Sequence, residues 1–296
     1  MRVNYVTAAP DTMPAVRYRM ILPGNYIGDY DISMIPVEAD VHVFCKPYTE
    51  DPYVLNAYKD MAKRLTYVLD ICDDVFQREG PVPDYMLHMA KGAAAVTAST
   101  EQIREKLLTF GIEAYVISDP YEFPETEPKS IDSPRVMWFG NKTSFDTLLN
   151  VECDYPVEIV CKDSKMIQHN RRLLKFPTTL TEWSIENMKR AFKRNNVVII
   201  PSKKDTKDHT YSAKSPNRVV ESIRNGMSVV AAPLPSYKQF DKWITLNWDM
   251  KLDLKPMTEE GQKYVRDNFD ISIIGEQWKT LFDSILGVEQ KSLRAG

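Results

Sequence analysis

Short apolar segments recur along the chain without the alternation of apolar and polar residues that a half-exposed strand shows. The segments Arg2–Val6, Asp40–Phe44 and Thr66–Leu69 are the first of them. A helical pattern separates the last two, because apolar side chains repeat every three or four residues within Asp51–Arg64. Such strands are buried on both faces, and helices between consecutive strands favour parallel pairing. The pattern therefore predicts a doubly wound α/β fold.

The same pattern begins again after a segment that suits neither a helix nor a strand. Residues 119–134 contain four prolines and five acidic residues, and we expect a linker there. The strands predicted beyond it are Arg135–Phe139, Val157–Cys161, Val197–Ile200 and Ser228–Ala232. Residues 258–286 have a helical pattern, with Trp278, Leu281, Phe282 and Ile285 on one face. The chain thus predicts two α/β domains followed by helices.

Composition and short motifs exclude several protein classes. With 43% hydrophobic and 27% charged residues, the chain is neither disordered nor embedded in a membrane. No apolar run reaches the roughly 18 residues of a membrane span, so we expect a cytoplasmic protein without a transmembrane segment. The four cysteines lack CxxC spacing, and we expect free thiols. The absence of HExxH, Walker and GxGxxG motifs speaks against zinc, ATPase and dinucleotide sites.

Charge is distributed unevenly along the chain. Residues 1–134 hold 12 basic against 21 acidic side chains, whereas residues 160–225 hold 15 basic against 6 acidic ones. A basic block of this size attracts anions such as the phosphates of a small ligand or of a nucleic acid, although a solvated basic surface gives the same count.

The segment from Val197 to Val230 carries the sharpest local signal. A buried strand leads into a polar loop, and a helix is predicted with Ser215 as N-cap, Pro216 as its first residue and Gly226 at its end. Lys214 and Arg218 place positive charge at the positive end of the helix dipole, which costs about 0.3–1 kcal/mol for each charge. A bound anion would reverse that sign. We therefore expect a phosphate site, with a solvated basic loop as the alternative.

Glu221 lies one helical turn beyond Arg218. Its carboxylate has the chemistry to accept hydrogen bonds from two ribose hydroxyls. Helical spacing also allows an ion pair with Arg218 or Arg224 instead.

The run Ser215-Pro-Asn-Arg218-x-x-Glu221, followed by Gly226 and a valine strand, resembles the donor-binding helix of retaining "group 1" glycosyltransferases with the GT-B fold. Weaker similarities lie in Asp70–Phe76, Val96–Thr100 and Trp138–Lys142, and in the tail from Tyr264 to Trp278. The family usually has Lys where Arg218 stands, and Ala213 replaces the first of its two paired glutamates.

The resemblance implies two Rossmann-like domains that face across a cleft. An N-terminal acceptor domain would span residues 1–125 and a nucleotide-sugar domain residues 135–262, with C-terminal helices in 263–296 packing back on the first domain. The residues implied for the donor are Gly140, Lys142, Lys214, Ser215, Asn217, Arg218 and Glu221. Asp73, Asp74 and Arg17 are the catalytic candidates on the acceptor side.

The implied reaction moves a sugar from a nucleotide-diphosphate donor to an acceptor hydroxyl with retention. The nucleotide sugar is a co-substrate, no cofactor is needed, and basic residues rather than a divalent metal hold the diphosphate, although Asp73 and Asp74 also suit Mg²⁺. The acceptor would be a carbohydrate, a lipid-linked sugar or a small molecule. Two alternatives stay open: a modified base in DNA as the acceptor, and a non-catalytic nucleotide- or polyanion-binding protein, which the missing glutamate at position 213 motivates.

Overall fold

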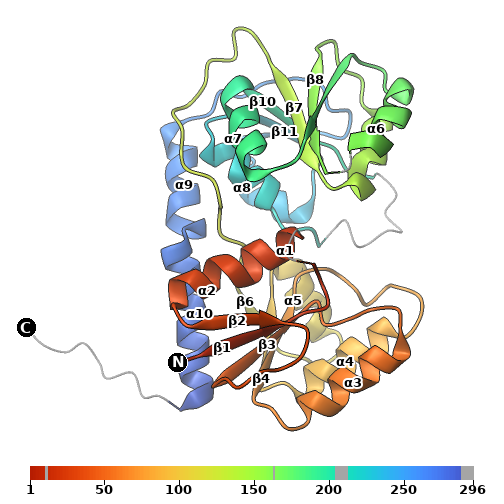
Figure 1. Ribbon diagram of the computed structural model, residues 1–296. Coiled ribbons are helices and arrows are strands. Elements are labelled where there is room, and N and C mark those ends of the chain that lie inside the picture. The colour runs from red at the N-terminus through yellow and green to blue at the C-terminus, as the bar shows by residue number, and fades with distance from the viewer. Residues whose placement is uncertain (11–12, 163, 204–212, 288–296) are drawn as a thin grey trace, which may run out of the picture. The chain divides into compact units, whose positions relative to one another are not determined.

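The computed structural model describes residues 1–10, 13–162, 164–203 and 213–287. The chain divides into two compact units (Figure 1). Unit 1 comprises Met1–Pro120, Ala213–Ser215 and Phe269–Gly296, and unit 2 comprises Tyr121–Ser212 and Pro216–Asn268. Each unit contains a six-stranded sheet in which all the pairings are parallel. The doubly wound α/β architecture predicted from the sequence is therefore confirmed in both.

Unit 1 has the strand order β2-β1-β3-β4-β5-β6. Its strands are β1 (Val3–Val6), β2 (Tyr30–Ser33), β3 (Val41–Cys45), β4 (Tyr67–Ile71), β5 (Ala95–Ala98) and β6 (Tyr115–Val116). Its helices are α1 (Pro14–Val16), η1 (Arg17–Ile21), α2 (Leu22–Ile27), α3 (Pro52–Ala62), α4 (Val82–Gly92), α5 (Glu101–Leu108) and α10 (Ile271–Leu286). The chain leaves β1 toward β2 on one side and places β3 on the other.

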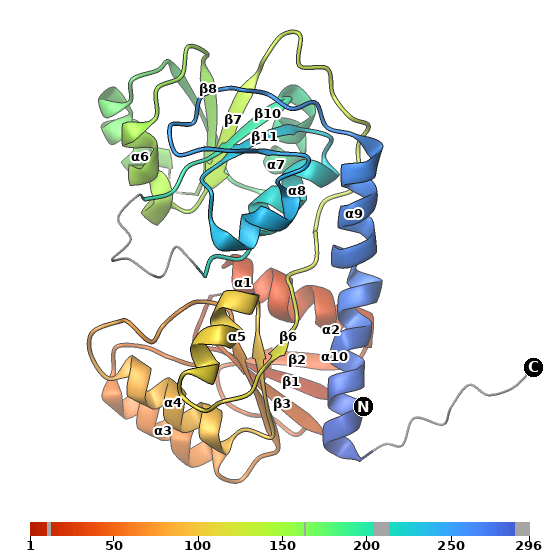
Figure 2. The same cartoon turned by 180° about the vertical axis from the view of Figure 1, so that it is seen from behind.

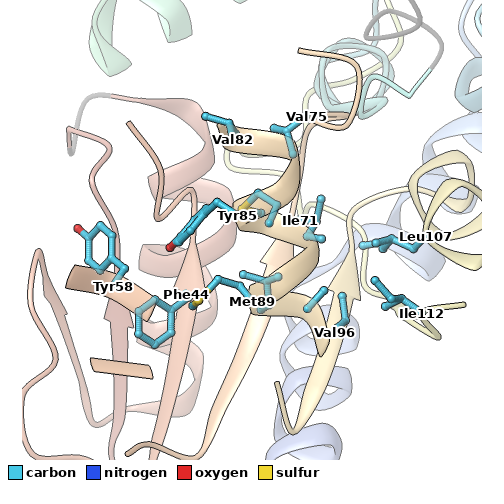
Figure 3. Close-up of a cluster of buried hydrophobic side chains, with 14 of the residues drawn as sticks. Phe44, Tyr58, Ile71, Val75, Val82, Tyr85, Met89, Val96, Leu107 and Ile112 are labelled. Atoms are coloured by element: carbon cyan, nitrogen blue, oxygen red, sulfur yellow. The ribbon is translucent and has the colours of Figure 1, made fainter. Parts of the chain in front are cut away.

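Both faces of this sheet are covered, as the apolar strands predict. Helices α3, α4 and α5 cover one face, where Phe44, Ile71 and Val96 from three strands meet Tyr85 and Met89 of α4 (Figure 3). Helices η1 and α10 cover the other face, which Val3, Tyr5, Val43 and Val68 supply from the strands (Figures 1 and 2). The apolar face of α10 contains Trp278, Leu281, Phe282 and Ile285, as predicted.

A proline explains the one π-helical turn described in unit 1. Pro23 lies inside the continuous helical segment 14–27 and has no N–H to donate to the carbonyl of Arg19. The segment Arg17–Ile21 forms a π-helical turn in which the amide of Leu22 donates to the carbonyl of Arg17. Arg19 lies in this turn and is buried.

Unit 2 has the strand order β12-β11-β10-β7-β8-β9. Its strands are β7 (Val136–Gly140), β8 (Val157–Cys161), β9 (Thr178–Glu182), β10 (Val197–Ile200), β11 (Ser228–Ala231) and β12 (Thr245–Leu246). Its helices are η2 (Lys142–Asn150), α6 (Ser164–Asn170), η3 (Arg171–Leu173), α7 (Ile185–Arg194), α8 (Asn217–Arg224), η4 (Pro235–Phe240) and α9 (Glu259–Phe269). Chain order reverses between β7 and β10, because β8 and β9 lie on one side of β7 and β10 on the other.

Residues 121–134, the core of the predicted linker, pack on unit 2 as an extended strap. The amide of Thr126 donates to the carbonyl of Arg224, and that of Lys129 donates to the carbonyl of Gly226. The Lys129 side chain also donates to the carbonyls of Phe192 and Asn195 at the end of α7. In the part of the chain that the structure describes, no helix is both long enough and apolar enough to cross a membrane, and all four cysteines are free thiols.

Candidate functional site

The carboxyl ends of β7 and β10 in unit 2 form the first candidate site. In open parallel sheets a ligand binds outside the carboxyl ends of the strands, at the point where the strand order reverses. There the chain continues from two neighbouring strands toward opposite edges of the sheet. Gly140 ends β7, and Lys142 follows it as the first residue of η2, whose N-cap is Asn141. Pro201, Ser202 and Lys203 follow β10, and Lys203 pairs with Asp146 of η2 at 3.1 Å. Residues 204–212 of the predicted polar loop lie outside the described part of the chain.

Gly140 packs directly over the Trp138 ring. A Cβ atom at position 140 would lie 2.8 Å from Cζ2 of Trp138, which is closer than real Cβ atoms approach. Trp138 is fully buried, so it has no room to move away. The end of β7 therefore requires glycine, and Gly140 itself is partly exposed.

Arg218 extends from α8 to the same edge of the sheet. Its Nη1 donates to the carbonyl oxygen of Phe139 at 3.4 Å. Burial raises the pKa of Tyr237, and the Arg218 guanidinium opposes that rise through its charge and a hydrogen bond to the phenolic oxygen. Arg218 is half-buried, and these two contacts hold its positive charge beside Gly140.

The start of α8 differs by one residue from the prediction. Pro216 is the N-cap and Asn217 the first helical residue, whereas Ser215 was expected to be the cap. The Ser215 hydroxyl donates to Oδ2 of Asp119 at 2.6 Å, a charge-assisted hydrogen bond within unit 1. The predicted end is confirmed, since Gly226 follows the helix in the left-handed conformation with φ +63°.

Glu221 is 1% exposed. Its Oε1 accepts a hydrogen bond of 2.6 Å from the amide of Glu122, and its Oε2 accepts one of 3.3 Å from the amide of Phe123. The carboxylate thus fixes the start of the strap to α8, a partner that helical spacing alone does not indicate.

Lys214 and Ser215 belong to unit 1, while Gly140, Lys142, Asn217, Arg218 and Glu221 belong to unit 2. In unit 1 the carbonyl of Ala213 accepts a hydrogen bond of 3.3 Å from Thr100, and Ala213 packs into the core cluster beneath α3, α4 and α5. Alanine therefore serves the packing of unit 1 at the position where the resemblance leads one to expect glutamate.

The acceptor-side candidates occupy different places in unit 1. Asp73 pairs with Lys46 after the ends of β4 and β3, and both side chains are partly exposed. Asp74 is buried, and its Oδ1 accepts a hydrogen bond of 3.1 Å from the amide of Phe76, which gives it a structural role in the turn. The Arg17 guanidinium lies 5.6 Å from the ring centroid of Tyr18.

A buried ionic network that sequence reasoning missed lies beside these residues. Arg19 donates to both oxygens of Asp70, at 2.6 and 3.0 Å, and to Asp119 at 3.3 Å. Thr97 donates to Asp70 at 2.7 Å. The charge of Arg19 is thereby neutralised in the core of unit 1. Its carboxylate partners lie 51 and 100 residues away in the chain, so no local sequence pattern indicates them.

Groups of three or more His, Cys, Asp or Glu side chains placed to hold a metal ion are absent among the described residues. The described part of the chain thus offers no preformed metal centre of that kind.

Comparison of the whole chain with solved structures gives several matches. The chain is similar to Anabaena Alr3699/HepE, solved in complex with UDP-glucose, with a TM-score of 0.69 and 12% identity over 96% of this chain and 100% of that one. It is also similar to AviGT4, a glycosyltransferase of avilamycin A biosynthesis, with a TM-score of 0.64 and 10% identity over 97% and 98% of the two chains. A DNA-modifying β-glucosyltransferase matches with a TM-score of 0.53 and 11% identity over 97% and 100%.

Searches of protein-family models and of curated proteins return no match for this sequence. At these low identities the structural similarity shows the fold alone. Together with the two parallel six-stranded sheets, it shows that the chain has the GT-B fold of two Rossmann-like domains.

Proposed function

We propose that the protein is a glycosyltransferase that moves a sugar from a nucleotide-diphosphate donor to an acceptor hydroxyl. The observation that carries this proposal is the placement of Arg218 beside Gly140, at the carboxyl ends of β7 and β10 in a GT-B-fold chain. A fixed cation beside the partly exposed Gly140 suits a diphosphate. The similarity to a chain solved with UDP-glucose supports a nucleotide sugar as the donor.

In the proposed reaction the chain's cations stabilise the leaving group. The bond between the anomeric carbon and the diphosphate oxygen breaks while the bond to the acceptor oxygen forms, and the diphosphate takes the hydroxyl proton. Arg218 and Lys142 of unit 2 neutralise the charge that grows on the diphosphate, and the first amides of α8, from Asn217 onward, donate to it. Because these groups supply positive charge, we propose that no divalent metal is required. The resemblance of the α8 segment to retaining glycosyltransferases supports a reaction with retention.

Glu221 is proposed to hold the ribose, because a carboxylate can accept hydrogen bonds from hydroxyl groups. The test is a comparison of UDP with 2′-deoxy-UDP. A ribose role predicts weaker binding of the deoxy compound, and equal affinities would exclude hydrogen bonding to the 2′-hydroxyl.

A DNA acceptor is the second candidate, favoured by the similarity to a DNA-modifying β-glucosyltransferase and by the basic block at 160–225. Unit 1 weighs against it, because it carries 21 acidic and 15 basic residues and a duplex is a polyanion. We therefore favour an uncharged acceptor.

A screen of UDP, GDP, ADP and CMP sugars tests the proposal. A ligand that binds only the folded state raises the melting temperature, and release of free nucleotide then measures turnover. Binding with slow hydrolysis of one nucleotide sugar is the expected result. Binding without any turnover would support the non-catalytic alternative, and no stabilisation by any nucleotide sugar would contradict the proposed function.

A further inference from the structure

Unit 1 has its own point of strand-order reversal, between β1 and β3. The carbonyl of Lys46, the residue after β3, accepts a hydrogen bond of 3.4 Å from the amide of Ala8, which follows β1. Beside them, Ser99 after β5 donates to the carbonyl of Cys72 after β4 at 3.4 Å. The residues that follow four adjacent strands thus gather at the edge where an open sheet binds its ligand.

Lys46 is held in an unusual backbone conformation at this edge. Its φ is +50°, in the left-handed region that side chains other than those of Gly, Asn and Asp seldom adopt. Such strain persists where the surrounding structure fixes it, and it concentrates at functional sites. Glycine would remove the strain here, but it would also remove the ammonium group.

The side chain of Lys46 pairs with Asp73. The lysine side chain is 15% exposed and the aspartate side chain 32% exposed. Lys46 is thus mostly buried, whereas Asp73 is accessible to a ligand. Burial opposes the lysine charge, but Cys72 and Asp73 hold the pKa of Lys46 well above its ordinary value. Lys46 is therefore charged at neutral pH, and its ion pair holds the Asp73 side chain in place.

The segment that carries Lys46 is itself fixed. Tyr48 packs against the core cluster beneath α3 and α4, and the Arg78 guanidinium lies 5.2 Å from its ring centroid. These contacts hold Tyr48, two residues after Lys46, against unit 1.

A carboxylate and an ammonium held side by side match the two hydrogen-bonding functions of an alcohol. The carboxylate accepts a hydrogen bond from the hydroxyl group. The ammonium has three N–H donors, so it can pair with Asp73 and also donate a hydrogen bond to the hydroxyl oxygen. The pair neutralises itself, so it offers no net charge to a phosphate. We propose that Asp73 binds and orients the acceptor hydroxyl, that Lys46 is the positioning residue for Asp73, and that the acceptor is a neutral polyhydroxyl compound such as a sugar.

This inference rests on the proposed glycosyltransferase function, and its test uses the nucleotide sugar that the screen identifies. Methyl glucoside and methyl glucuronide serve as neutral and anionic acceptor probes for the parent, Lys46→Met, Lys46→Arg and Asp73→Asn. Lys63→Met is the matched control, because it removes an exposed lysine of the same unit that also pairs with an aspartate. The measurements are KM and kcat for each probe, the affinity for UDP by calorimetry, and the melting temperature.

We expect Lys46→Met to raise KM for methyl glucoside about tenfold, the loss of one charge-assisted contact, with UDP affinity kept within about twofold. Lys46→Arg should recover part of the loss, Asp73→Asn should reproduce it even if Lys46→Met does not fold, and the glucuronide should be the poorer probe for the parent. Equal behaviour of Lys46→Met and Lys63→Met, or a parallel loss of UDP affinity, would overturn the role of Lys46. Equal use of both probes would overturn the neutral acceptor. A parent that turns over no nucleotide sugar would instead overturn the proposed function, and this assignment with it.

Discussion

At the scale of single residues, the buried carboxylate of Glu221 makes a contact whose strength can be measured. Glu221→Gln keeps the shape of the side chain but removes the charge and replaces one acceptor oxygen with a donor, which faces the amides of Glu122 and Phe123. We expect the free energy of unfolding to fall by about 1.5–3 kcal/mol, the range for hydrogen bonds to charged groups. Urea denaturation measures this change.

Glu186→Gln is the control for that substitution. Glu186 is exposed and pairs with Arg190 one helical turn away, and such pairs contribute about 0.3–0.5 kcal/mol. Equal effects of the two variants would mean that the strap contacts of Glu221 do not stabilise the fold.

Asp119 contributes to the pH dependence of the stability of unit 1. Burial raises the pKa of Asp119 above its ordinary 3.8, although Arg19 and Ser215 oppose the rise. As pH rises from 3.8 the unfolded chain loses this proton before the folded one does, so the contribution of Asp119 to stability is complete below 3.8 and is lost as pH passes through the raised pKa. We expect Asp119→Asn to show a flatter decline of melting temperature with rising pH above about 4 than the parent does. Parallel profiles would contradict the raised pKa.

Some of these residues could be recognised from the sequence and others could not. Arg218 and Gly226 were found because a helix end has a local signature of charge, proline and glycine. Lys46 and Asp70 were not recognised as site and network residues, because their roles come from partners 27 and 51 residues away in the chain. No local pattern marks a lysine that follows a strand as the partner of an aspartate that follows the next one.

At the scale of elements, the strap 121–134 shows what composition leaves open. Prolines and acidic residues correctly indicated that the segment has no regular structure, but not that it packs. Glu125 pairs with both Arg224 of α8 and Arg266 of α9. Long-range partners of this kind convert a predicted linker into part of unit 2.

Gly226 tests the packing of the strap on the end of α8. A Cβ at position 226 would lie 2.1 Å from the carbonyl oxygen of Glu127, and φ is already +63°. Gly226→Ala should therefore destabilise through both backbone strain and a clash, by about 3 kcal/mol or more.

Gly111→Ala separates the two effects. Gly111 has φ +71°, but nothing lies within 4 Å of the position of its Cβ. This variant should lose only the strain contribution, about 1 kcal/mol. Equal losses of stability for the two variants in thermal unfolding would show that the strap moves to make room for the added methyl group.

Two of the strands that the sequence did not predict share a physical cause. β2 and β9 are edge strands whose side chains are partly exposed, so they lack the continuous apolar run that marked β1, β8 and β10. The segment η2 that follows β7 is a 3₁₀ helix that begins at Lys142, where the side chain of Asn141 accepts a hydrogen bond from the amide of Thr143.

At the scale of the whole molecule, the charge difference between the units leads to a prediction about duplex DNA. Unit 1 has six more acidic than basic residues, so we expect no measurable duplex binding even at low ionic strength. If DNA is the acceptor, a plot of log affinity against log salt concentration should have a slope of about −0.9 for each neutralised phosphate. Fluorescence anisotropy with a labelled duplex distinguishes the two results.

The melting temperature of Arg218→Ala with and without UDP tests the donor site most directly. In the empty protein Arg218 lies in the first turn of α8, against the helix dipole, so its loss should change the melting temperature little. With UDP present, the same charge completes a charge-assisted contact with the diphosphate, and the variant should lose most of the UDP-induced rise seen in the parent. Arg218→Lys should recover part of it. An Arg218→Ala protein that melts much earlier without ligand, yet retains the full UDP-induced rise, would contradict a diphosphate site at the carboxyl ends of β7 and β10.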